Sequence, residues 1–166
     1  MPFGWARTCP VGRALVDRAP SPRSRRPAGG RAHRDAGGKA DMRECRIVRG
    51  DAGGGYRGKQ GLDYFAGISA ESAGSGGLCL HLLVLPPGAE ARPHLHENHE
   101  SAIFVLEGSS SFRHGRDLEL VDTVNAGDFV YIPAGMPHQP FNPTDRPTRA
   151  LIARTDPNEQ ESVVLL

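Results

Sequence analysis

The sequence predicts a small all-β domain, either a sandwich or a barrel of short strands. Roughly seven or eight strand-length segments follow one another after residue 77, and Gly, Pro or Asn bounds each of them. The chain has 21 glycines and 14 prolines, an excess that suits a turn-rich fold. No segment shows the apolar periodicity of a long helix.

The first clear strand covers residues 78–85, where the apolar run LCLHLLVL stops at Pro86, Pro87 and Gly88. Before it, residues 43–77 are rich in glycine, and they predict loops with one or two short edge strands. After it, residues 91–96 predict a strand and residues 97–99 a tight polar turn.

The remaining strands are bounded by the same turn residues. Residues 101–108 predict a strand closed by a glycine, and residues 109–115 and 118–124 predict a hairpin. A further strand is expected in each of the segments 128–133, 138–141 and 150–155, and a last edge strand in 162–166.

The length of 166 residues argues for one domain, preceded by a segment of different composition. Residues 1–40 carry nine basic and two acidic groups, a net charge of 9 − 2 = +7, whereas the remainder has 11 − 17 = −6. We interpret residues 1–41 as a disordered basic extension, and residues 42–166 as the folded domain, with Met42 as the natural start. A targeting or nucleic-acid-binding arm is the alternative for the extension.

Several classes of protein are disfavoured. The acidic main body gives no support for nucleic-acid binding, and no apolar run is long enough to span a membrane. The three cysteines are scattered without a CxxC spacing, which favours a reducing, cytoplasmic location.

The first chemical signal is the pair His94 and His96. Residues two apart in a strand point to the same face, so these imidazoles project side by side. If they point inward, an apolar barrel gives them few polar partners, and a metal ion would supply one. An outward-facing pair in water is the alternative.

The second signal lies around His138. Gly127 precedes the strand 128–133, Pro133 and Gly135 end it, and His138 begins the next strand. His138 could therefore face a metal held by the first pair, although alone it would indicate only a surface histidine beside a turn.

Together the two signals resemble the paired signature of the cupin superfamily. The matching positions are Gly88, His94, His96, Glu100, Gly108, Gly127, Pro133, Gly135, His138 and Asn142. The resemblance implies a double-stranded β-helix, the jelly-roll or cupin barrel, over residues 42–166, with its core motifs at 88–142. It also implies a divalent metal, Fe, Mn, Ni or Zn, held by three histidines and commonly by a glutamate.

One position departs from the family pattern. The glutamate usually lies six residues before the closing glycine, and here Ser101 occupies that place while Glu100 precedes it. We expect Glu100 to be the fourth ligand, turned inward by a bulge, with solvent completing the shell as the alternative. His99 is a weaker substitute, expected to be a turn residue in water.

Other side chains are candidates to line the pocket: His81, Phe104, Phe129 and Tyr131. Core packing is the alternative for the aromatic residues, and a satisfied core histidine is the alternative for His81.

A three-histidine site with open positions can activate oxygen, act as a Lewis acid or generate hydroxide. We favour a metal-dependent oxidoreductase of the dioxygenase type acting on a small organic molecule. The alternatives are a module that binds a metal or small ligand without turnover, and a cupin isomerase or decarboxylase. No individual catalytic residue is predicted. The resemblance also implies a homodimer, paired through the segment before Leu78 or through the strand 162–166.

Overall fold

The structure is a computed structural model that describes residues 45–50, 55–158 and 162–166. The predicted disordered extension, residues 1–41, lies outside these residues. The strands all lie in the compact unit that runs from Ala40 to Leu166.

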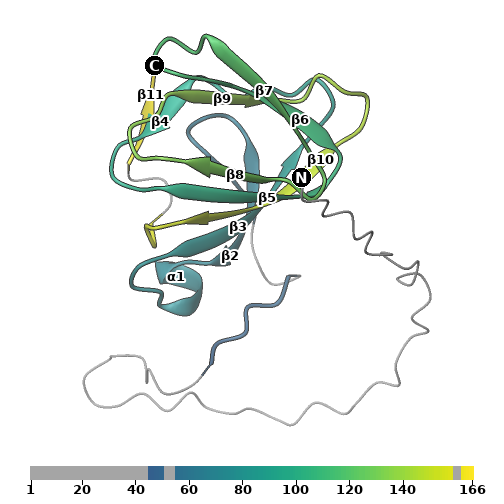
Figure 1. The fold of residues 1–166 in the computed structure, drawn as a ribbon. Helices are drawn as coiled ribbons and strands as arrows, with labels where there is room; N and C mark the ends of the chain where they lie inside the picture. Colours follow the sequence, from purple (N-terminus) through teal and green to yellow (C-terminus); the bar gives the residue numbers. More distant parts are fainter. Residues whose placement is uncertain (1–44, 51–54, 159–161) are drawn as a thin grey trace, which may run out of the picture. The chain divides into compact units, whose positions relative to one another are not determined.

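Two antiparallel sheets face each other and form the predicted all-β double-stranded β-helix, or jelly roll (Figure 1). The six-stranded sheet contains, in spatial order, β1 (Gly55–Arg57), β2 (Asp63–Ile68), β3 (Cys79–Leu85), β10 (Thr148–Arg154), β5 (Ser101–Glu107) and β8 (Phe129–Ile132). The five-stranded sheet contains β11 (Val163–Leu165), β4 (His94–His96), β9 (His138–Phe141), β6 (Ser109–His114) and β7 (Leu120–Asn125).

Every strand predicted after residue 77 is present, although β4 is shorter than the predicted segment 91–96. The glycine-rich region before β3 contains the two short strands β1 and β2. They are followed by α1 (Ala70–Ala73), a single helical turn capped by Ser69. Within the described ranges, no helix has the length and apolar character that crossing a bilayer requires.

The core lies between the sheets because the strands alternate buried and accessible residues. In β3 and β10 every second residue is buried, as expected for strands whose one face packs on a core. The resulting cluster of buried side chains comes from both sheets: Leu62, Tyr64, Leu83, Leu85, Ala91, Ile103, Phe112, Ile132, Ala150 and Ile152.

Two residues of the sequence motifs shape the barrel without lining its cavity. Gly108 has a φ of 80°, and a Cβ there would lie 2.5 Å from the carbonyl oxygen of Pro147, so only glycine fits between β5 and β6. Asn142 is buried, and its Nδ2 donates to the carbonyl oxygens of Leu85 and Arg146 at 3.0 and 2.7 Å. Its side chain therefore ties the end of β9 to the end of β3 and to the loop before β10.

Candidate metal centre

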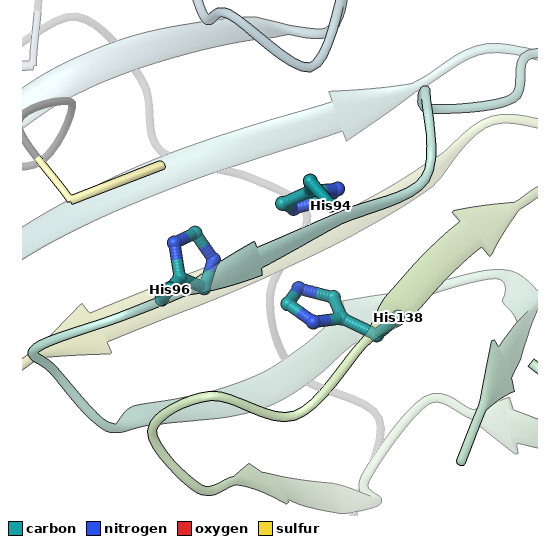
Figure 2. A group of neighbouring side chains, drawn as sticks. All are labelled: His94, His96 and His138. Carbon is teal, nitrogen blue, oxygen red and sulfur yellow. The ribbon is translucent and has the colours of Figure 1, made fainter. Parts of the chain in front are cut away.

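Three imidazoles meet inside the barrel. His94 and His96 project from β4 and His138 from the start of β9, and Figure 2 shows the three rings gathered around one point. Their ring nitrogens lie within 4.8 Å of one another, and all three side chains are buried, with exposures of 2–3%. The predicted convergence of the two sequence signals is therefore present in the fold.

Strand pairing explains this convergence. His94 and His138 stand directly opposite each other in the antiparallel pair β4–β9, and His96 lies two residues along the same face of β4. The turn before His138 is held against β4, because the N–H of Gly135 donates to the carbonyl oxygen of His96 at 2.7 Å. Gly135 has a φ of 74°, a left-handed conformation that favours glycine at this turn.

The hydrogen bonds of two rings leave one nitrogen of each available. Nδ1 of His94 lies 2.8 Å from the carbonyl oxygen of Arg92, and Nδ1 of His138 lies 2.9 Å from that of Met136. Since a carbonyl oxygen only accepts, each Nδ1 carries the proton and each Nε2 keeps its lone pair. Neutral imidazoles fixed in this way suit a divalent transition metal.

The environment of the cluster keeps the rings neutral. Burial, and then the proximity of His138, lowers the pKa of His94 to about 3, while burial lowers that of His138 to about 4. Burial also lowers the pKa of His96, and the positive charge of Arg154 lowers it further. No proton has to leave these rings before a metal binds at neutral pH.

The cluster lines a cavity of about 30 Å³ between the sheets. This is room for roughly two water molecules. Its polar lining consists of the three histidines with Tyr64, Ser101, Ser110, Thr148 and Arg154, and the rest of its described lining is apolar or proline. Among these lining residues there is no carboxylate.

Glu100 lies outside the cavity, unlike the sequence-based expectation. The residue directly precedes β5, in which Ser101 and Ile103 face inward, so the alternation of the strand turns Glu100 outward, and no bulge reverses it. Its Oε1 accepts a 2.8 Å hydrogen bond from the hydroxyl of Tyr131 on the surface, and this bond raises the pKa of Tyr131.

We therefore expect Glu100→Gln to leave the metal affinity within about twofold of the unchanged protein, because no ligand is lost. Competition with a chromogenic chelator measures the affinity. The same variant should lower the pKa of Tyr131, seen in the ultraviolet absorbance of its phenolate, because the carboxylate no longer disfavours the charged phenolate. A tenfold loss of metal affinity would show that Glu100 is a metal ligand.

His99 is buried rather than in water, which corrects the prediction from sequence. Its ring stacks on that of His96 at a centroid distance of 4.3 Å, and its Nδ1 lies 2.6 Å from Oγ of Ser162. Asp156 lies 3.7 Å from the same nitrogen. His99 thus connects the C-terminal strand to the ring of His96.

The other pocket candidates lie elsewhere. His81 is buried in β3 with its ring against the edge of Tyr56, and it is not part of the cavity lining. Phe104 and Phe129 pack on each other on the outer face of the six-stranded sheet, because Ile103 and Val130 occupy the alternate positions. Phe104 does not line the cavity either.

Phe129 and Tyr131 do line a second hollow. They are 81% and 63% exposed and border a cleft of about 340 Å³ between β8 and the strands β6 and β7. This edge cleft shares Phe112, Ile132 and His138 with the inner cavity. The two hollows therefore adjoin at these three residues.

Sequence reasoning missed Arg154, the last residue of β10. It follows Ala150 and Ile152 at every second position, on the inward face of that strand. This alternation was the signal in the sequence that could have identified Arg154 as an inward-facing residue. The side chain is only 3% exposed, and the nearest aromatic partner is Tyr64, whose ring centre lies 5.6 Å from the guanidinium carbon. Such a contact stabilises by roughly 0.5–2 kcal/mol, whereas burying an ion costs several kcal/mol.

Comparisons with known proteins agree with this fold. Residues 81–154 match the family model described as "Cupin domain". The polyketide cyclase RemF from Streptomyces resistomycificus is 24% identical, with a TM-score of 0.61 over 74% of this chain and 86% of that one. No curated protein matches the sequence.

Two further solved structures share the architecture. An uncharacterised conserved protein with a double-stranded β-helix domain from Klebsiella pneumoniae is 19% identical, with a TM-score of 0.55 over 74% of this chain and 97% of that one. Oxalate decarboxylase from Bacillus subtilis is 21% identical, with a TM-score of 0.61 over 72% of this chain and 31% of that one. At these identities the likeness shows the fold alone.

Proposed function

Residues 81–154 of this chain form a cupin domain, and from this premise we propose that its three-histidine cluster binds a divalent metal and oxidises a small organic molecule. The reaction would be of the dioxygenase type. The observation that carries the proposal is the cluster itself: three neutral, buried imidazoles on one side of a small cavity.

The residues present fit a metal. His94, His96 and His138 would hold it, and the carbonyl oxygens behind His94 and His138 fix which nitrogen faces it. Fe, Mn, Ni and Zn are all compatible with imidazole ligands. When bound, a redox-active ion of this group supplies Lewis-acid and electron-transfer chemistry.

The barrel supports such chemistry in two ways. Three protein ligands leave coordination positions open on the cavity side, where a chelating substrate can be placed. Apolar side chains from both sheets surround these positions and limit the access of water, which protects reactive species from side reactions. The edge cleft beside His138 offers the substrate a route inward.

The cavity favours this reaction class over an isomerase or a decarboxylase that transfers protons through a side chain. Such a reaction needs a group that takes up and returns a proton near neutral pH. The described lining contains no carboxylate, and burial raises the pKa of the Tyr64 hydroxyl, which keeps it protonated. A binding module without turnover is the remaining alternative.

Two further features belong to the proposal. We propose a homodimer; the edges β1 and β11 correspond to the two segments that the sequence indicated for pairing. A cytoplasmic location is proposed from the cysteine pattern alone.

The test begins with elemental analysis of protein purified without an affinity tag, followed by oxygen-electrode measurements with a panel of small chelating acids and diols. We expect bound iron, or another redox-active metal, and oxygen consumption that depends on one of these compounds. Protein that stays metal-free when offered iron, manganese, nickel and zinc would overturn the proposal. Bound metal without oxygen consumption, or turnover without oxygen, would favour the alternatives.

A further inference from the structure

Arg154 and Ser101 are neighbouring polar groups in the cavity wall, and several of their polar atoms have no hydrogen-bond partner among the described residues. They stand directly opposite each other in the antiparallel pair β10–β5, so their side chains project to the same face. Nε and Nη1 of Arg154 and Oγ of Ser101 have no hydrogen-bond partner among the described residues. Both side chains are buried, with exposures of 3% and 2%.

No carboxylate in the described lining of the cavity compensates the charge of this wall. The described cavity lining contains one guanidinium and no carboxylate, and the imidazoles contribute no negative charge. A divalent metal on the histidines would raise the formal charge of the cavity further. Buried charges in proteins are normally paired, and Tyr64, which meets Arg154 through a hydrogen bond and a cation–π contact, is uncharged and does not replace a counter-ion.

We propose that the cavity binds a small carboxylate between Arg154 and the histidine cluster, with Ser101 as a second donor. The proposal rests on the proposed function, and it names the substrate class of that site. The guanidinium would donate charge-assisted hydrogen bonds to the carboxylate, whose single negative charge offsets that of Arg154.

Size and charge favour a carboxylate over a phosphate. The cavity of about 30 Å³ has room for roughly two waters, which a group of a few atoms can replace. In the metal-free cavity, a single guanidinium matches the one charge of a carboxylate, whereas a phosphate dianion normally meets paired cations. The rest of the ligand would extend toward the edge cleft, which shares His138 with the cavity.

The experiment measures acetate binding to the full chain, both metal-free and loaded with zinc, by calorimetry and ligand-observed NMR. Acetamide has the same shape without the charge, and sulfate is the tetrahedral anion for comparison. We expect acetate to bind to the unchanged protein at least about tenfold more tightly than acetamide or sulfate. Arg154→Gln should weaken acetate binding at least about tenfold, and Arg154→Lys should restore part of it.

Arg149→Gln is the matched control, because Arg149 lies on the same strand but faces outward beside Glu107. It should bind acetate like the unchanged protein. Unchanged acetate affinity in Arg154→Gln, or equal affinity for sulfate, would overturn the proposal. If Arg154→Gln does not fold, then an unchanged affinity for acetate in both Arg154→Lys and Ser101→Ala would overturn the proposal.

The two proposals fail in different ways. If zinc binds and acetate does not, the carboxylate proposal is wrong and metal binding stands. If zinc does not bind but acetate binding still requires Arg154, the anion site stands and the metal proposal is wrong.

Discussion

Replacing His138 by alanine is expected to lower the affinity for a divalent metal by at least about an order of magnitude, and in practice to yield metal-free protein. Changes that merely disturb a ligand's supporting hydrogen bonds already cost about 10–100-fold in metal affinity, and this variant removes a ligand altogether. His138 faces the two histidines of β4 across the β4–β9 pair.

His114 provides the matched control. It stands opposite His138 on β6, but its Nε2 lies 2.8 Å from a carboxylate oxygen of Asp122, away from the three-histidine cluster. His114→Ala should keep its metal. Elemental analysis and chelator competition compare the two variants, and circular dichroism checks that each is folded. Equal metal content in folded His138→Ala and in the unchanged protein would show that His138 is not a ligand.

The sequence predicted the three histidines because local rules were sufficient for them. The spacing of His94 and His96 places both on one face of any strand, and the glycine and proline pattern before His138 predicted where a new strand begins. Neither pattern showed that the strands pair with each other. That step came from the resemblance to cupins, and the register of β4 and β9 confirms the pairing.

Glu100 and His99 show where local rules fail. Glu100 was the glutamate nearest to the position expected from the family pattern, but the inward-facing positions of β5 begin at Ser101. Which positions of a strand face inward depends on which of its faces meets the opposite sheet. His99 was placed in a turn, yet it is buried by Ser162, a residue 63 positions away. Contacts over such separations leave no periodic signal in the sequence.

Arg154 was missed for a different reason. Its strand was predicted correctly, and the inward positions Ala150 and Ile152 were recognisable, but a charged residue at a strand end usually reaches solvent. Only the structure shows that the guanidinium stays buried beside the cluster. The interior of the barrel therefore combines groups that the sequence identifies by motif with a charge that only the fold reveals.

The metal-free protein is expected to lose stability steeply below pH 6.5. Below that value, the ordinary pKa of histidine, the imidazoles of an unfolded chain take up protons. The folded chain does not, because its pKa values are about 3 for His94 and about 4 for His138, and that of His96 is also lowered by burial. The unfolded state therefore binds more protons, and the free energy of unfolding falls as the pH falls.

The size of the effect follows from counting these protons. Each contributes a slope of about 1.4 kcal/mol per pH unit, so the three histidines of the cluster give about 4 kcal/mol per unit. His99, whose pKa is also lowered by burial, adds to this slope. Small domains are stable by roughly 5–15 kcal/mol, so we expect acid unfolding between about pH 5 and about pH 3. Urea titrations at successive pH values measure the slope. His94→Gln should reduce the slope, since one buried imidazole is lost.

Saturating zinc should move the transition to lower pH, because a ligand at a hundredfold over its Kd adds about 2.7 kcal/mol to the folded state. The metal and the protons thus compete for the same three nitrogens, and the metal binds the folded chain while the protons favour the unfolded one. A metal-free protein whose free energy of unfolding stays constant from pH 7 to about 4.5 would mean that the three rings are accessible to water. Such rings would not form the preorganised, neutral ligand set on which the metal centre depends.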